Sequence, residues 1–242
     1  DLIDKKIDVL VTAPINKHNM QQEGFNFPGH TEYLATQANT TNYLMMMVSD
    51  NLRVAVVTGH VPLRNVAQQI TRETILAKLK LMSDSLKMDF GIRKPKIAVM
   101  GLNPHSGDNG LIGKEELEII TPAIQEATKQ NVFAMGPYAT DGFFGSGAYR
   151  KFDGILAMYH DQGLIPFKTL SFSTGVDYTA GLSFIRTSPD HGTGFEIAGK
   201  NVANEESFRQ AIFTACDIFD KRSEHMEINA NPLVFSKRSG DR

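Results

Sequence analysis

The chain has 242 residues, of which 41% are hydrophobic and 21% charged, with a formal net charge of −2. This length suits one large domain or two smaller ones with a real core. The near-neutral charge argues against a nucleic-acid surface, and no apolar run approaches the roughly 18 residues that a membrane span requires. The single cysteine, Cys216, excludes an internal disulfide framework and a cysteine-based zinc site. We expect a soluble, cytoplasmic globular protein without nucleic-acid or membrane partners.

Short apolar, β-branched runs alternate with helical patterns along the chain. The runs that predict strands are Ile7–Thr12, Val54–Thr58, Ile97–Met100, Val132–Met135 and Gly154–Met158. Alternation of this kind predicts an α/β fold with a mainly parallel sheet and helices on both faces.

Three segments have the apolar spacing of helices. Thr71 predicts the N-cap of a helix whose apolar residues recur on one face as far as Leu86. Lys114–Lys129 predicts a second helix, in which Pro122 is either an interruption or a marker of the true start. Asn204 predicts the cap of a last helix. Its expected apolar face is Phe208, Ala211, Ile212, Ala215 and Phe219.

Three of the predicted strands lead, within a few residues, to a histidine: His60, His105 and His160. Ligands of open parallel sheets bind outside the carboxyl ends of the strands, so these side chains are expected to face one crevice. Three neutral imidazoles there form a catalytic metal site with an open position. Zinc suits such ligands best, with cobalt, manganese and magnesium as alternatives. Taken singly, each histidine is more often a hydrogen-bonded loop or core residue.

Two further motifs belong to the same edge. "TAPINK" follows the first strand, and "FPGHTE" places a Pro-Gly turn before His30 and Thr31. One interpretation is a loop with a helix cap at Thr31. The other is a helix N-terminus whose backbone N–H groups, with Thr31, hold an anionic substrate.

Charged residues in the second half of the chain also admit two interpretations. Asp161, in "HDQG", either orients the imidazole of His160 or caps a turn. Lys168 and Arg186 are either solvated charges or, in a cleft, ligands for carboxylate and phosphate. The glycine-rich stretch "DHGTGFEIAGK" lets a ligand approach the backbone closely, but no GxGxxG follows the first strand.

Together the motifs resemble the 4-hydroxythreonine-4-phosphate dehydrogenase family of vitamin B6 biosynthesis. "TAPINK", "FPGHTEYLA", "GHVPLR", "GLNPHSGD", "AMYHDQGLIPFK" and "GLSFIRTSPDHGT" stand in the family's order. The resemblance implies NAD- and divalent-metal-dependent oxidation and decarboxylation of 4-phosphooxy-L-threonine to 3-amino-2-oxopropyl phosphate, in pyridoxal phosphate biosynthesis. It also implies a homodimer whose metal ligands come from both subunits.

The resemblance assigns roles residue by residue. It gives the metal to His60, His105 and His160, and catalysis to Lys168 and Asp141. The implied substrate contacts are His30, Thr31, Lys168, Asp177 and Arg186, and the implied coenzyme contacts are Asp190, His191 and Thr193.

The resemblance also implies an isocitrate/isopropylmalate dehydrogenase-like fold, in which two domains flank a cleft. Residues 1–195 then form the metal, substrate and dimerisation domain. Residues 196–242 form the C-terminal segment of the coenzyme-side domain, and family members have a further portion before the point that matches Asp1. That portion builds much of the coenzyme-side domain.

One position departs from the family pattern, which usually has Asn where this chain has Asp177. An added carboxylate repels an anionic substrate unless it is protonated or paired. A paralogous dehydrogenase of 4-phospho-threonate or 4-phospho-erythronate is therefore an alternative. A non-redox metal hydrolase or acyltransferase, which binds no NAD, is an alternative of another class. A structural metal in a non-catalytic module is a third, and it calls for a closed four-ligand site.

Overall fold

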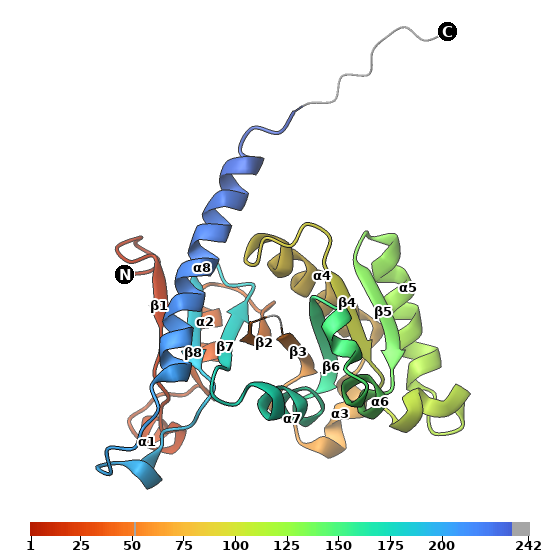
Figure 1. The fold of residues 1–242 in the computed structure, drawn as a ribbon, viewed down its shortest axis with the longest axis horizontal. Coiled ribbons are helices and arrows are strands. Elements are labelled where there is room, and N and C mark those ends of the chain that lie inside the picture. The colour runs from red at the N-terminus through yellow and green to blue at the C-terminus, as the bar shows by residue number, and fades with distance from the viewer. Residues whose placement is uncertain (51, 234–242) are drawn as a thin grey trace, which may run out of the picture.

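The computed structural model describes residues 1–50 and 52–233, which form an α/β fold around one mixed sheet (Figure 1). The strands are β1 Val9–Val11, β2 Leu44–Ser49, β3 Leu52–Thr58, β4 Lys96–Met100, β5 Phe133–Tyr138, β6 Gly154–Tyr159, β7 Val176–Ala180 and β8 Ile185–Pro189. The α-helices are α1 Lys17–Gln22, α2 His30–Gln37, α3 Val66–Gln69, α4 Arg72–Met88, α5 Thr121–Lys129, α6 Thr140–Gly145, α7 His160–Ser171 and α8 Glu206–Asn229. Shorter helical segments are η1 Leu63–Asn65, η2 Pro104–Gly110, η3 Glu116–Ile120, η4 Ala148–Lys151 and η5 Phe195–Ile197.

The described strands form an eight-stranded sheet in the order β1-β8-β7-β2-β3-β6-β4-β5. Strands β3, β6, β4 and β5 pair in parallel, as do β1 and β8. The other pairs are antiparallel: β2 pairs with β3 and with β7, and β7 pairs with β8. The predicted mainly parallel α/β class is confirmed. The prediction omitted β2, β7 and β8, whose sequences are rich in methionine or polar residues.

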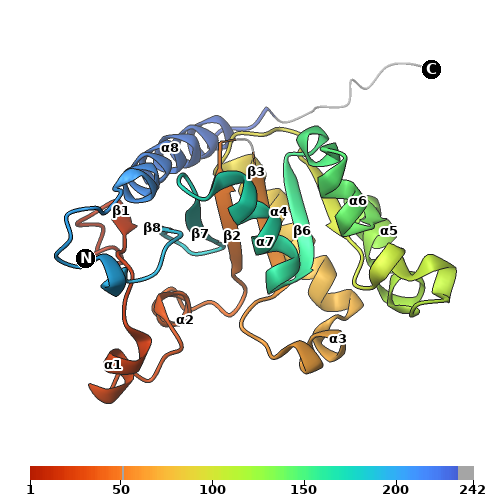
Figure 2. The ribbon, with the colours of Figure 1, turned by 60° about the horizontal axis from the view of Figure 1, so that its bottom comes forward.

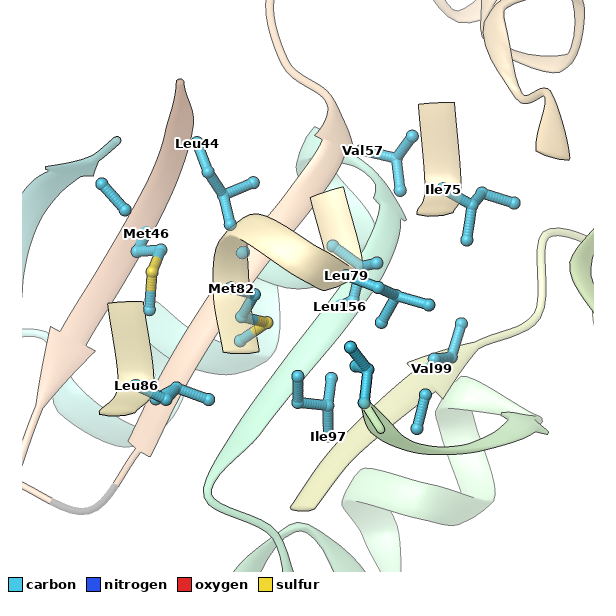
Figure 3. Packing of buried hydrophobic residues seen from close by; sticks show 14 of the residues in the cluster. Leu44, Met46, Val57, Ile75, Leu79, Met82, Leu86, Ile97, Val99 and Leu156 are labelled. Atoms are coloured by element: carbon cyan, nitrogen blue, oxygen red, sulfur yellow. The ribbon is translucent and has the colours of Figure 1, made fainter. Parts of the chain in front are cut away.

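Side chains of each central strand point alternately to two hydrophobic clusters. In β3, Ala55 and Val57 face the cluster that holds α4, α5 and α8, whereas Val54 and Val56 face the cluster that holds α6 and α7. Figure 3 shows the first cluster, with side chains of α4 lying between those of β2, β6 and β4. Helices therefore cover both faces, as predicted.

The helix predicted after Thr71 is α4, and Thr71 is its N-cap. The hydroxyl of Thr71 accepts from the N–H of Thr74, and the Thr74 hydroxyl accepts from the N–H of Thr71. This reciprocal pair satisfies two backbone donors that the first turn leaves without partners. Within the buried face, Leu79 and Leu86 are 0% exposed. Truncating such a leucine to alanine costs about 2–5 kcal/mol.

The helix predicted over 114–129 is divided at Pro122. A π-helical turn, η3, precedes it, and α5 begins at Thr121 with the proline in its first turn. Pro122 thus marks the true start of the α-helix, because the first turn needs no N–H from it.

The predicted apolar face of the last helix is confirmed at Ala211 and Ala215 but wrong at Ile212 and Phe219. The buried residues of α8 are Ser207, Ala211, Ala215 and Ile218, whereas Ile212 and Phe219 are 42% and 38% exposed. Small residues face the sheet because α8 packs closely on β8, β1 and β7. Asn204 lies outside the helix but accepts from the N–H of Glu206 at 2.8 Å.

A buried polar cluster ties α8 to the rest of the core. Asp89, at the end of α4, is 1% exposed and accepts from Ser85 and Tyr178 at 2.6 Å each. Arg222 of α8 donates to the other carboxylate oxygen at 2.9 Å. Burial raises the pKa of Tyr178, so its hydroxyl stays a donor. One carboxylate therefore joins α4, β7 and α8.

None of the described helices combines the length and apolarity that crossing a bilayer demands.

Candidate active site

A pocket of about 400 Å³ lies at one end of the sheet, where α1, α2 and α7 begin. Figure 2 shows α1 and α2 together at this end, away from α8. Of the residues assigned from the sequence, those lining it are His30, Thr31, His60, His160, Lys168, Asp177, Arg186, Asp190 and His191. The sheet thus brings most of the assigned residues to one place.

His60 and His160 lie on neighbouring parallel strands, as the strand-end argument expects. His60 follows β3, His160 follows β6, and the two ring centroids are 6.0 Å apart. The carboxylate of Asp161 lies 2.7 Å from Nδ1 of His160, which leaves Nε2 to face a ligand. Two imidazoles on one tetrahedral zinc, with Zn–N bonds of about 2.0 Å, hold their centroids about 5 Å apart. The observed separation is about 1 Å longer, so the two rings lie near the spacing of a shared ligand pair without matching it.

His105 follows β4, the next parallel strand after β6. It is exposed, and it is not among the residues that line the pocket of His60 and His160. Within residues 1–50 and 52–233, no three His, Cys, Asp or Glu side chains gather closely enough to hold a metal ion. The three-histidine site stays a prediction, in which a second subunit supplies the missing ligand.

The loop that carries His105 has an unusual backbone. His105, Ser106, Asp108 and Asn109 have φ angles of 53°, 50°, 42° and 54°, and Gly107 between them has 79°. A left-handed conformation costs roughly 1–2 kcal/mol for each non-glycine residue, somewhat less for Asn and Asp. Tertiary contacts must therefore hold this segment in place.

Arg186 forms the floor of the pocket, and its guanidinium is fully engaged. It is 3% exposed and donates to Asp177 at 2.8 Å, to Ser188 at 2.9 Å and to Thr12 at 2.9 Å. Asp177 is thus paired with a positive charge, which offsets part of the repulsion expected of an unpaired carboxylate. Its Oδ1 is buried and has no hydrogen-bond partner among the described residues.

Lys168 projects from α7 toward the end of β8. Its Nζ lies 3.0 Å from Oδ1 of Asp190 and donates to the Asp190 carbonyl at 3.3 Å. Burial raises the pKa of Asp190, and the ion pair with Lys168 opposes that shift. The ammonium is still partly open to the pocket, with its side chain 40% exposed.

His30 and Thr31 begin α2, and Gly29 is the N-cap, with no side-chain cap bond. Burial lowers the pKa of His30, and the charge of Arg186 lowers it further. Glu32 is next to them, and its Oε1 lies 3.9 Å from Nδ1 of His60. The His60 imidazole is the main cause of the lowered pKa of Glu32.

The glycine-rich stretch forms a second cavity of about 1030 Å³ beside the first. His191 and Gly192 line both cavities, and Thr193 lines the second. The apolar side chains of Phe172, Phe195 and Ile197 complete its wall. The two cavities therefore adjoin at His191 and Gly192.

Asp141 lies apart from both cavities. It is exposed in the first turn of α6, beside Thr140, whose hydroxyl accepts from Gln162 at 3.0 Å. Gln162 also donates to the carbonyl of Gly101 and accepts from the N–H of Met158 at 2.6 Å. The structure therefore links Thr140, the neighbour of Asp141, to the strand ends of β4 and β6, and Asp141 lines neither cavity.

The sequence argument did not single out four residues that take part in these contacts. Thr12 and Ser188 accept from Arg186, Glu32 faces His60, and Lys17 lines the pocket. Thr12, Lys17 and Glu32 lie in the quoted motifs "TAPINK" and "FPGHTE", so their position beside the strand end was the available signal. Ser188 lies in the quoted motif "GLSFIRTSPDHGT", two residues after Arg186, but inside a strand that was not predicted.

Comparison with known proteins gives one consistent result. The family model "Pyridoxal phosphate biosynthetic protein PdxA" matches residues 1–215. A 4-hydroxythreonine-4-phosphate dehydrogenase from Bacteroides thetaiotaomicron is 56% identical over 228 residues, covering 94% of this chain and 63% of the relative. The chain therefore spans less than two thirds of that relative's length.

Solved structures agree with this. The 4-hydroxythreonine-4-phosphate dehydrogenase from Klebsiella pneumoniae is 38% identical with a TM-score of 0.79, covering 90% of this chain and 66% of that one. A putative 4-hydroxythreonine-4-phosphate dehydrogenase from Salmonella typhimurium is 41% identical with a TM-score of 0.79, covering 89% and 66%. The fold, the motif order and the family match lead to one conclusion: the chain belongs to the pyridoxal phosphate biosynthetic protein PdxA family.

Proposed function

We propose that this chain carries the metal- and substrate-binding part of an NAD-dependent 4-hydroxythreonine-4-phosphate dehydrogenase of the cytoplasm. The reaction is the oxidation and decarboxylation of 4-phosphooxy-L-threonine to 3-amino-2-oxopropyl phosphate. The carrying observation is that one pocket joins two imidazoles, a lysine and an arginine to the start of the glycine-rich loop. The names of the similar proteins support the same reaction.

The metal is assigned to His60, His105 and His160, and zinc fits these imidazole donors best. A divalent metal held by these residues would supply Lewis-acid stabilisation of the negative charge that develops on the substrate. Asp161 fixes the ring of His160 through Nδ1, so that Nε2 is the donor. The proposal includes a homodimer, in which His105 of one subunit completes the site of the other.

The substrate is held by charge and by the start of α2. Lys168 is partly exposed in the pocket, and it binds the anionic end of the substrate or moves a proton at the reacting centre. His30 and Thr31 contribute the first N–H groups of α2 and their side chains. Arg186 contributes its positive charge from the floor of the pocket, where hydrogen bonds to Asp177 and Thr12 fix the orientation of its guanidinium.

The coenzyme is assigned to the second cavity, with Asp190, His191 and Thr193 as its contacts. NAD held there would supply the acceptor for the substrate's hydride. Because His191 lines both cavities, coenzyme and substrate would meet beside it. Residues 1–195 then act as the metal and substrate domain and residues 196–242 as part of the coenzyme side. Asp141, which lies near the strand ends, keeps its proposed catalytic role.

The test is binding of 4-phosphooxy-L-threonine to this chain by calorimetry, with and without Zn²⁺. We expect binding that depends on the metal and that His160→Ala abolishes. Lys168→Ala should weaken it at least about tenfold, because an ionic hydrogen bond contributes about 1.5–3 kcal/mol. Equal binding by the wild-type chain and His160→Ala would refute the metal assignment.

Two added ligands separate the alternatives. A sugar-acid dehydrogenase would bind 4-phospho-threonate in preference to 4-phosphooxy-L-threonine. A non-redox enzyme would bind no NAD at any metal concentration. Formation of NADH from 4-phosphooxy-L-threonine, followed by its absorbance, is the outcome that only the proposed dehydrogenase gives.

A further inference from the structure

The loop that carries His105 is wrapped around one buried carboxylate, that of Glu116. Glu116 begins η3 and is 2% exposed. Its Oε1 accepts from the backbone N–H groups of Leu102 and Asn103 at 2.7 Å each. Its Oε2 accepts from the side-chain amide of Asn103 at 3.0 Å. Three donors just after the end of β4 therefore converge on this one side chain.

The same carboxylate meets the loop again on the other side of His105. A Cβ added to Gly107 would lie only 2.6 Å from Oε2 of Glu116. No side chain other than hydrogen fits between them, so Gly107 packs directly on the carboxylate. The two contacts, at Asn103 and Gly107, flank His105 at equal distance in the sequence.

These contacts explain the left-handed backbone of the loop. His105, Ser106 and Asn109 all have positive φ angles, which L-residues rarely adopt in succession. A strained segment persists only where its surroundings fix it. The buried carboxylate therefore fixes the backbone position from which the exposed side chain of His105 projects.

We propose that Glu116 is the positioning residue for His105: its carboxylate, through the hydrogen bonds that it accepts, holds the loop so that the imidazole is presented to the metal. This proposal rests on the proposed role of His105 as a metal ligand. Glutamine at position 116 keeps the shape but has only one acceptor oxygen. Its amide would face the amide of Asn103, donor to donor.

The experiment is a Co²⁺ titration of the full chain, followed by the visible absorption of the bound metal, with thermal unfolding of the metal-free chain as a second measurement. Glu116→Gln and Gly107→Ala should each weaken Co²⁺ binding about 10- to 100-fold. The matched controls are Glu118→Gln, an exposed acid of the same η3 segment, and Gly110→Ala. Gly110 also has a positive φ, of 90°, but an added Cβ there meets Leu117 rather than Glu116.

The outcomes separate the metal-ligand role of His105 from the positioning role of Glu116. Wild-type Co²⁺ affinity in Glu116→Gln, together with loss in His105→Ala, would overturn the positioning role and leave the metal site standing. Wild-type affinity in His105→Ala would remove the ligand assignment itself, and the role of Glu116 with it. Equal loss in Gly110→Ala would mean that any strain in the loop suffices, which also overturns the proposal. If Glu116→Gln fails to fold, Gly107→Ala, which keeps the carboxylate, decides.

Discussion

Two arginine–aspartate ion pairs meet strand β7 at neighbouring residues, on its opposite faces. Arg222 pairs with Asp89 beside Tyr178, and Arg186 pairs with Asp177. The Asp89 pair lies in the core, where both carboxylate oxygens have donors. The Asp177 pair lines the pocket, its aspartate side chain is 21% exposed, and its Oδ1 has no partner in the described part of the chain.

The difference separates a structural charge from one that faces a ligand. A buried pair is tolerated best when its polar atoms find partners, and both carboxylate oxygens of Asp89 have donors. In the pocket, by contrast, Oδ1 of Asp177 has no hydrogen-bond partner among the described residues. We infer that the Asp89 pair governs stability, whereas the Asp177 pair sets the charge that an anionic ligand meets.

Asp89→Ala should have the largest effect on folding. It leaves the guanidinium of Arg222 buried without its counter-charge and deprives Ser85 and Tyr178 of their acceptor. Breaking a buried pair in this way costs about 3–5 kcal/mol. The free energy of unfolding in urea measures the loss.

Asp84→Ala is the matched control for that change, because Asp84 is an exposed aspartate of the same helix, α4. Its effect should stay within about 0.5 kcal/mol. A loss below about 1 kcal/mol in Asp89→Ala would place the cluster outside the folding core and remove the contrast with Asp177.

The same contrast explains what the sequence could predict. Strands β3, β4 and β6 were predicted because both of their faces are buried and read as apolar runs. Strands β7 and β8 were not, because Asp177, Arg186 and Ser188 make their sequences polar where they form the pocket wall. The positions of His60 and His160 followed from the strand-end rule, and their proximity agrees with it.

Buried carboxylates escaped the sequence argument for another reason. Asp89 and Glu116 lie in or beside helical patterns, where an acid normally faces water. Their partners are fixed only by the tertiary fold, as with Asp89 and Arg222, which are 133 residues apart. A pattern of hydrophobicity carries no record of such contacts.

Asp177→Asn should change ligand binding more than stability. The amide oxygen can still accept from Arg186, so the free energy of unfolding should move by less than about 1 kcal/mol. Removing one negative charge from the pocket should strengthen binding of inorganic phosphate about tenfold at low salt, since charges a few ångströms apart in a protein interact by a kcal/mol or more. Calorimetry with phosphate measures this.

Asp217→Asn makes the same charge change on exposed α8, outside the pocket, and should leave phosphate affinity unaltered. Weaker phosphate binding in Asp177→Asn would mean that the orientation which Asp177 gives Arg186 outweighs the negative charge that it adds to the pocket. A stability loss as large as that of Asp89→Ala would show that the two pairs play the same role.

The smallest expected effect concerns the pKa of His30, which the charges of both Arg186 and Asp177 influence. Burial is the main cause of its lowered pKa, the charge of Arg186 adds to it, and that of Asp177 opposes it. Because the folded pKa lies below the unfolded value of 6.5, the unfolded chain binds the proton first as the pH falls. The stability associated with neutral His30 is complete above pH 6.5 and declines from there down to the folded pKa.

His30→Gln should lose this decline, so urea midpoints of the two chains should converge from pH 7.5 to pH 5.5. Since burial outweighs the charges, the difference should survive in high salt, which screens Arg186 but does not hydrate a buried ring. A difference that vanishes in salt would reverse that order and make the ion pair the dominant influence on His30.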